Sequence, residues 1–131
     1  MRTLPFLAVT GACLLSACQK EPGEGGKAEI KGKVYAIEWD ENTGQKVDSF
    51  YVAEARVYIV YGDHEAYDDD TRTGPDGLYK FSWLRKGEYT VFTYSECPTC
   101  PNGTEAVLET VEIGDRKESV EVPTLRVNIW H

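Results

Sequence analysis

The chain has 131 residues, with 14 Lys and Arg against 22 Asp and Glu, so its formal net charge is −8. This length indicates one domain. The acidic balance excludes a nucleic-acid binder, because phosphate backbones are bound by clustered Lys and Arg. Hydrophobic residues make up 41% of the chain and aromatic residues 11%, which is enough for a core and excludes wholesale disorder.

The first residues have the pattern of an export signal. Arg2 provides a positive start, and the apolar run from Leu4 to Leu15 is too short to span a bilayer. The run ends in Leu15-Ser16-Ala17-Cys18, which resembles the lipobox of bacterial lipoproteins. In that family the signal is cut before the Cys and a lipid is joined to its thiol. The resemblance therefore implies a signal peptide over residues 1–17 and lipidation of Cys18.

Two or three acyl chains hold a protein on a membrane almost permanently. Gln19 follows the Cys in place of Asp, so the inner-membrane retention signal of enterobacterial lipoproteins is absent. Cys18-Gln19-Lys20-Glu21 also resembles a short signal that sends some Gram-negative lipoproteins to the cell surface. We therefore expect a lipid-anchored protein of the outer membrane, facing outward or toward the periplasm. The alternative, a buried first helix with a chance Cys, is disfavoured because the run has no polar face.

Residues 18–28 are predicted to form a flexible, lipidated tether. The stretch from Gln19 to Lys27 consists of Gly, Pro, Gln and charged residues, a composition typical of flexible coil. The folded domain is then expected over residues 29–131.

From Ala28 onward the chain shows no helical period. Short runs alternate apolar and polar residues and are rich in β-branched and aromatic side chains, a pattern that predicts half-buried strands. Pro123 lacks an amide hydrogen and is expected at an edge or a bulge of the last strand. Six or seven short strands separated by turn residues predict a β-sandwich. The expected strands are Ile30–Glu38, Ala55–Tyr61, Leu78–Trp83, Tyr89–Tyr94, Thr104–Ile113 and Glu118–Ile129.

Two blocks of the sequence resemble carboxypeptidase regulatory-like domains. The first comprises Gly32-Lys33-Val34-Tyr35, Thr43-Gly44-Gln45-Lys46-Val47 and Ala55-Arg56-Val57-Tyr58-Ile59, and the second runs from Thr73 to Phe81 and continues through Leu84, Gly87 and Tyr89. The resemblance implies a seven-stranded Greek-key sandwich of the transthyretin-like (prealbumin-like) type, which is commonly a non-catalytic module. The enzymatic hydroxyisourate hydrolases of that fold end in Tyr-Arg-Gly-Ser, whereas this chain ends in Asn128-Ile129-Trp130-His131.

Cys97-Pro98-Thr99-Cys100 is the sharpest local motif. In an exported protein two Cys this close are expected to form a disulfide. A redox motif of this spacing would need a helix N-terminus to lower the pKa of its first thiol, but Pro101-Asn102-Gly103 continues a turn. A zinc site would need two further ligands. We expect a structural disulfide, with a thiol–disulfide redox protein as an alternative function.

Asp68, Asp69 and Asp70 are the residues that come nearest to a metal site. Calcium takes six to eight oxygen ligands, but the spacing matches no EF-hand loop. A solvated, self-repelling loop is the favoured interpretation, and a calcium-stabilised adhesin-like domain is a second alternative. No cofactor is predicted.

Tyr58, Phe92 and Tyr94 lie opposite the presumed core faces of their strands. An exposed aromatic patch would stack on sugars or anchor a protein partner. The other interpretation is that these rings cover the ends of the core. No nucleophile turn such as Gly-x-Ser-x-Gly is present, and no enzyme is expected. The sequence thus predicts a membrane-anchored lipoprotein with a non-catalytic binding or accessory module, whose partner is an envelope protein or a glycan.

Overall fold

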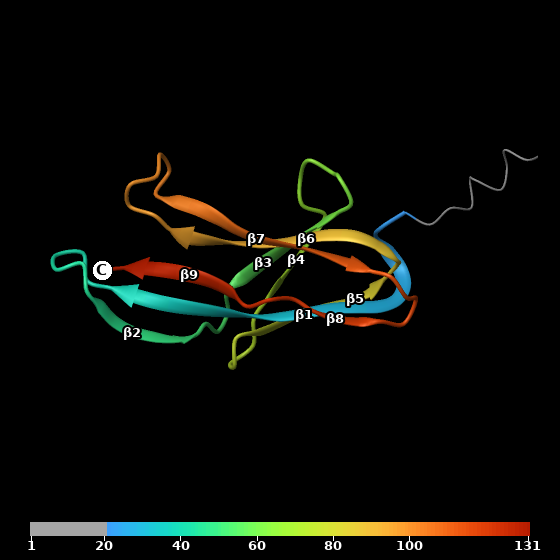
Figure 1. Ribbon diagram of the computed structural model, residues 1–131, viewed down its shortest axis with the longest axis horizontal. Helices are drawn as coiled ribbons and strands as arrows, with labels where there is room; N and C mark the ends of the chain where they lie inside the picture. The colour runs from blue at the N-terminus through green and yellow to red at the C-terminus, as the bar shows by residue number, and fades with distance from the viewer. Residues whose placement is uncertain (1–20) are drawn as a thin grey trace, which may run out of the picture.

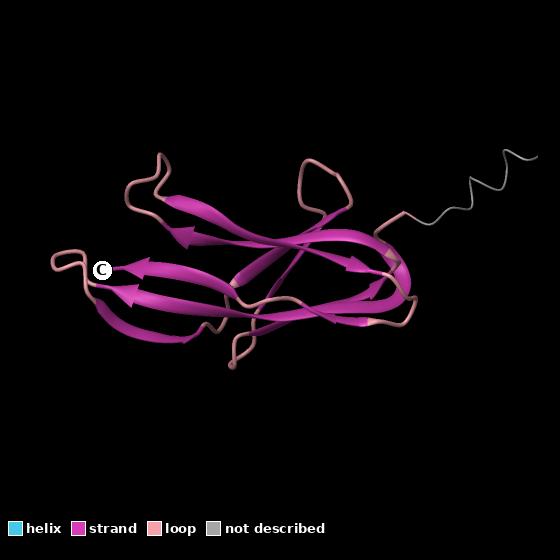
Figure 2. Cartoon of the chain, in the orientation of Figure 1, coloured by secondary structure: helices cyan, strands magenta, loops and turns pink. Residues whose placement is uncertain are grey.

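The computed structural model describes residues 21–131, which form strands and connecting loops but no helix (Figures 1 and 2). Nothing in this part of the chain could cross a membrane as a helix. The predicted all-β sandwich is confirmed, with nine strands in place of seven. They are β1 (Glu24–Trp39), β2 (Lys46–Tyr51), β3 (Arg56–Tyr61), β4 (Asp69–Arg72), β5 (Leu78–Leu84), β6 (Gly87–Glu96), β7 (Thr104–Ile113), β8 (Ser119–Glu121) and β9 (Leu125–Trp130). The predicted signal peptide and Cys18 lie outside the described residues.

The first sheet is built around β1. One edge of β1 pairs antiparallel with β5 up to Lys33 and then with β2 from Tyr35 onward. The other edge pairs in parallel with β8 and then with β9. The second sheet has the order β4-β3-β6-β7, with every neighbouring pair antiparallel. Figure 1 shows the two sheets as layers that run along the long axis of the molecule.

The core lies between the two sheets and follows the alternation of strand side chains. Every second residue of β1 from Ala28 to Ala36 is buried, and so are Val57 and Ile59 of β3 and Tyr89 and Val91 of β6. Full burial of such a side chain contributes about 1.5–3 kcal/mol relative to leaving it exposed. The remaining core residues are Tyr79, Phe81, Leu84, Ile113, Val122, Leu125 and Val127.

The last expected strand is divided at Pro123 into β8 and β9. Two residues lie between Lys31 and Val34 in β1, whereas three lie between their partners Glu121 and Leu125. One extra residue therefore bulges out at the position of Pro123, where the chain needs no donor. The prediction that Pro123 occupies an edge or a bulge is confirmed.

Strands β2 and β4 were not expected as strands from the sequence. Their side chains are mostly exposed, so they lack the alternating apolar residues that mark a half-buried strand. Asp69 and Asp70, expected in an acidic loop, instead begin the edge strand β4. The short edge strand with charged side chains limits further strand pairing.

Strict alternation along the expected strand Leu78–Trp83 would place Trp83 on the core face with Tyr79 and Phe81, but Trp83 does not lie there. Its backbone has φ +60° and its side chain is 69% exposed. The change of backbone direction at Trp83 places Leu84 in the core instead, where it is 2% exposed. The alternation therefore stops one residue before the strand ends.

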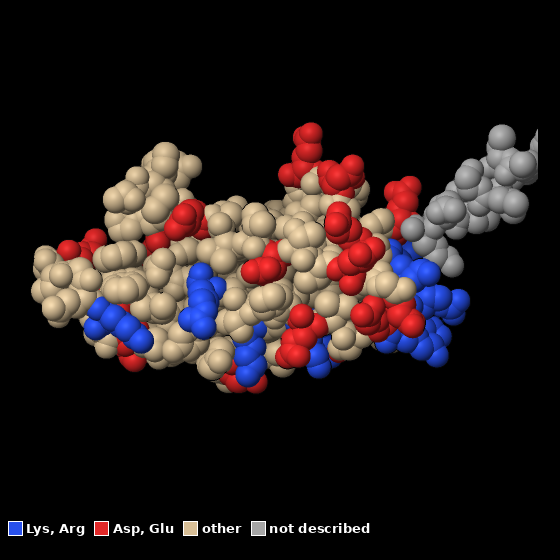
Figure 3. All heavy atoms as spheres, viewed as in Figure 1, with Lys and Arg blue, Asp and Glu red and all other residues tan. Residues whose placement is uncertain are grey.

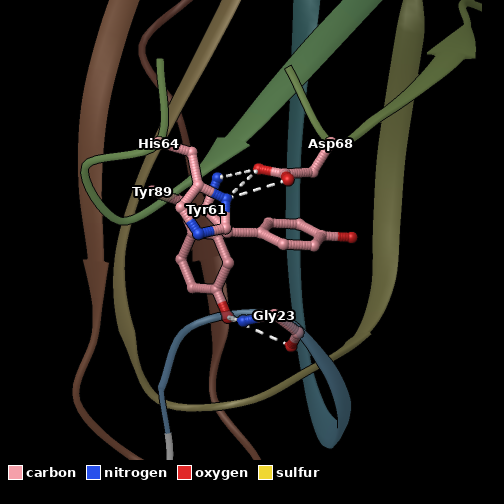
Figure 4. A network of polar contacts seen from close by, with 5 residues as sticks. All are labelled: Gly23, Tyr61, His64, Asp68 and Tyr89. Carbon is pink, nitrogen blue, oxygen red and sulfur yellow. Dashed lines mark hydrogen bonds and ion pairs between the residues drawn. The ribbon is translucent and has the colours of Figure 1, made fainter. Parts of the chain in front are cut away.

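The expected boundary at residue 29 is also wrong, because β1 begins at Glu24. The amide of Gly23 donates a hydrogen bond of 2.8 Å to the hydroxyl of Tyr89, as Figure 4 shows. A side chain at Gly26 would collide with the carbonyl of Leu84. In the folded protein these glycines allow the chain to pack closely against the β5–β6 turn. Their composition alone had indicated a flexible coil.

We predict that Tyr89→Phe lowers the free energy of unfolding by about 1–3 kcal/mol, because it leaves buried polar groups without a partner. The Tyr89 hydroxyl accepts from Gly23 and donates to the carbonyl of Arg85 at 2.6 Å. Tyr79→Phe is the matched control, since the buried Tyr79 hydroxyl has no hydrogen-bond partner among residues 21–131. This control is expected to be neutral or stabilising. Urea denaturation measures both variants, and equal losses would contradict this account.

Candidate functional site: an aromatic face on the second sheet

A row of apolar side chains crosses the outer face of the second sheet. Tyr58 of β3 lies directly opposite Phe92 of β6, which lies opposite Leu108 of β7. Directly opposite residues project from the same side of a sheet. Because the neighbouring residues Val57 and Val91 are buried in the core, this row faces away from it.

Four aromatic rings meet on this surface. Tyr58 and Phe92 are stacked, with ring centroids 5.0 Å apart and an interplanar angle of 17°. Tyr94 packs its edge against both rings, at 5.8 Å from Tyr58 and 5.7 Å from Phe92. Tyr67 packs edge-on against Tyr58 at 4.7 Å. The structure thus brings together the three rings singled out in the sequence. With Tyr67 and Leu108, they form a surface that we call the aromatic face.

The aromatic face is open to solvent. Tyr67 is 50% exposed, Tyr94 53% and Leu108 56%. The exposure of Tyr94 favours an open surface over the other interpretation, in which the rings cover the ends of the core, while Tyr58 and Phe92 are partly buried. Tyr67 was missed because it lies in the loop between β3 and β4, outside any alternating run. Leu108 lies on the exposed side of β7, and the alternation of residues along this strand could have identified it.

Polar groups flank the aromatic face on the same side of the sheet. Asp70 of β4 lies directly opposite Tyr58. Thr90 and Thr110 face one another across β6 and β7, with their hydroxyl oxygens 3.5 Å apart. A cluster of rings with hydrogen-bonding groups beside it can contact the apolar side of a ligand and bind its polar edges.

The acidic segment after β3 forms a separate network. Asp68 accepts hydrogen bonds from Nδ1 of His64 at 2.9 Å and from the amide of Tyr61 at 2.7 Å (Figure 4). Asp69 and Asp70 are consecutive in a strand, so their side chains point to opposite faces. The structure therefore does not bring Asp68, Asp69 and Asp70 together as ligands of one cation. The carboxylates near Tyr61 have another effect, because burial of this side chain together with their charge raises the pKa of Tyr61 to about 12.

Cys97 and Cys100 form the predicted disulfide, with their Cα atoms 5.3 Å apart. It lies in the turn between β6 and β7, where the amide of Cys97 donates to the carbonyl of Gly103 at 2.8 Å. Within residues 21–131, one group of potential metal ligands is compact enough to hold an ion. It consists of the two Cys sulfurs and the carboxylate of Glu105. Both sulfurs are used by the disulfide, and no helix begins at this turn. The arrangement favours a structural bridge over redox or metal chemistry.

A cleft of about 320 Å³ lies beside the disulfide turn, and nothing in the sequence pointed to it. Trp130 lines the cleft and stacks on Trp39 at 5.6 Å. The amide of Trp130 donates to Glu96 and that of Asn128 to the hydroxyl of Ser95, both at 2.8 Å. These side chains of β6 occupy the free edge of β9, which would otherwise be open to strand addition. Glu41, Cys97, Pro98, Thr99 and Glu105 complete the lining.

No family model matches the chain, and no curated protein does. Five solved structures match it. One is a proposed carbohydrate-binding protein from Pseudomonas aeruginosa, with a TM-score of 0.47 and 12% identity over 88% of this chain and 94% of that one. Another is (S)-allantoin synthase, with a TM-score of 0.42 and 14% identity over 81% of this chain and 43% of that one. Similarities this distant concern the chain path alone, and we take no ligand or activity from either protein. The transthyretin-like assignment stays a prediction.

We predict that the His64–Asp68 pair makes the fold more stable on the acidic side of neutrality. The hydrogen bond that His64 donates to Asp68, together with the negative charge of Asp68, raises the pKa of His64 above the usual 6.5. The contribution is therefore complete below the unfolded-state pKa of about 6.5 and is lost as the pH rises through the folded value. Thermal melts should show the largest difference between the wild type and His64→Gln near pH 6. A difference that grows toward pH 8 would contradict this assignment.

Proposed function

We propose that the protein is a lipid-anchored lipoprotein of the outer membrane whose sandwich binds a glycan at the aromatic face without catalysis. The observation that carries the proposal is the contiguous set of Tyr58, Tyr67, Phe92 and Tyr94, in which Tyr67 and Tyr94 are half exposed and Tyr58 and Phe92 are partly buried. A sugar ring has one side made of C–H groups, which packs on an aromatic ring, and hydroxyl groups around its rim, which need polar partners.

The flanking residues match this chemistry better than they match a large protein interface. Asp70, Thr90 and Thr110 place a carboxylate and two hydroxyls beside the rings. A protein partner would be expected to bury an anchor in a well-packed pocket, whereas Tyr94 and Leu108 stand on an open sheet surface. An open face also accommodates a chain that extends past it in both directions. We therefore favour an extended polysaccharide as the ligand.

The absence of catalysis in the proposal follows from the kind of groups on the face. Acid–base catalysis needs a donor and an acceptor within hydrogen-bond reach of one bound atom, in a site that excludes water. The aromatic face consists of four rings and one Leu, and Asp70 beside it projects from an open edge strand. These groups are suited to adhesion.

The lipid anchor in the proposal rests on the motif that ends in Cys18. The described structure adds a geometric argument in its favour. The first described residue, Glu21, comes three residues after Cys18, and the chain enters the sandwich at one end of its long axis (Figure 1). An anchor attached there would leave the rest of the long axis free to project from the membrane.

We predict that Tyr67→Ala combined with Tyr94→Ala weakens polysaccharide binding by at least about ten-fold, because exposed aromatic anchors commonly contribute upward of about 2 kcal/mol each. Affinity electrophoresis through gels that contain envelope and capsular polysaccharides measures the change. Trp83→Ala is the control, since Trp83 is even more exposed, at 69%, but belongs to β5 of the other sheet and lies off the aromatic face. A wild-type chain that no polysaccharide retards, or equal losses in both variants, would contradict the glycan assignment.

We predict that the mature protein begins at Cys18 and carries acyl groups. Expressed in a Gram-negative host, the full chain should sediment with the outer membrane, and its intact mass should exceed that of residues 18–131 by the acyl groups. Cys18→Ser should abolish the added mass. Cys13→Ser, in the same segment, should leave it unchanged. A soluble, unmodified wild-type chain would rule out the anchor.

A further inference from the structure

One end of the sandwich has a positively charged pocket of about 280 Å³, although the chain as a whole has a net charge of −8. Its four charged side chains are Lys27 at the start of β1, Arg85 and Lys86 in the β5–β6 turn, and Arg116 in the β7–β8 loop. No carboxylate lines it, and the remaining lining is the backbone of Gly25 and Gly26. We call these six residues the basic pocket. Figure 3 shows Lys and Arg gathered at this end of the molecule.

The cations of the basic pocket are not neutralised by ion pairs in the part of the chain that the structure describes. None of the four takes part in an ion pair within residues 21–131. Nε of Arg85 is buried without a hydrogen-bond partner in this part of the chain. The amide of Arg85 donates to the carbonyl of Gly23 at 2.8 Å, which fixes the residue against the start of the fold. Like charges held close together repel one another, so the pocket favours an anion that contacts several of them at once.

The basic pocket lies at the end of the molecule where the chain enters. Pro22 packs against Gly87, and Gly23 is hydrogen-bonded to Tyr89, so the fold begins almost at once after Glu21. Glu21 is only three positions after Cys18, and an extended chain spans at most about 3.6 Å per residue. A lipid on Cys18 would therefore hold this end of the sandwich, rather than the disulfide end, within about 11 Å of the membrane.

We propose that the basic pocket binds the phosphate of an anionic lipid headgroup and so orients the domain on the membrane. This inference rests on the proposed lipid anchor for its location but not for its chemistry. The pocket is large enough for a phosphate group together with part of the headgroup, and Arg and Lys are the side chains that bind phosphate best.

The proposed orientation has a consequence for the aromatic face. Strand β6 begins at Gly87, next to the basic pocket, and Tyr94 lies seven residues further along it. At about 3.4 Å per residue this places Tyr94 about 24 Å farther from the membrane. With the phosphate bound, the sandwich stands on end, and the aromatic face runs parallel to the membrane normal and faces sideways into the solvent rather than against the lipid.

The test uses unlipidated protein, so that its outcome does not depend on the anchor. A chain that starts at residue 18 and carries Cys18→Ser retains the whole core, which lies between Ala28 and Val127. Its sedimentation with phosphatidylglycerol vesicles is compared with that on phosphatidylcholine vesicles at low ionic strength. The test variant combines Lys27→Gln, Lys86→Gln and Arg116→Gln, all at exposed positions. The control removes the same charge through Lys46→Gln, Arg72→Gln and Arg126→Gln, which lie on strands away from this end.

Binding to anionic vesicles is expected for the wild type, with no binding to phosphatidylcholine. Each Lys or Arg near an anionic surface strengthens binding about five-fold, so the test variant should lose about a hundred-fold and the control less than about ten-fold. No wild-type binding, or equal losses in the two variants, would overturn the proposal. So would inorganic phosphate that shifts the amide resonances of Gly25 and Gly26 while vesicles stay unbound, since the site would then serve a free anion. A chain that binds vesicles here but is not acylated in cells would leave the pocket assigned and remove only the anchor.

Discussion

The pairing of β1 along both of its edges is the constraint on which the rest of the structure depends. Strand β1 runs for 16 residues and is paired with β5 and β2 on one side and with β8 and β9 on the other. Because side chains alternate along a strand, this pairing sets which residues of five strands point inward. Gly32, in the middle of β1, leaves the space that the ring of Tyr79 occupies. The pairing register of the first sheet therefore also determines the shape of the core.

Strand β6 joins this core to all the surfaces with a proposed role. At its start, Tyr89 holds Gly23 and the Arg85 turn, next to the basic pocket. Further along, Phe92 and Tyr94 point outward into the aromatic face, while Ser95 and Glu96 cap the edge of β9. The strand then ends in the disulfide turn. Because β6 is paired with β7 along its whole length, it fixes the distance between the end that we place at the membrane and the rings that we place on a ligand.

The early start of β1 changes the picture of how the domain would sit on a membrane. A flexible tether of 11 residues would let the sandwich tumble at some distance from the lipid. With Pro22 and Gly23 already packed on the fold, only a few residues remain for that purpose. The position and orientation of the sandwich on the membrane would then depend on the positive charge of the end that holds the basic pocket. The net negative charge of the chain conceals this local charge.

Local patterns in the sequence were enough to predict the strands that face the core, the edge or bulge at Pro123 and the Cys97–Cys100 bridge. Each of these is specified by residues within a few positions of one another. Strands β2 and β4, the fate of the glycines before Ala28, and the contribution of Tyr67 to the aromatic face could not be found in this way. The basic pocket is the clearest such case, because Lys27, Arg85 and Arg116 come from three distant segments. They meet only when the two sheets pack and their turns converge at one end, and that convergence is set by long-range strand pairing, which no short window of sequence contains.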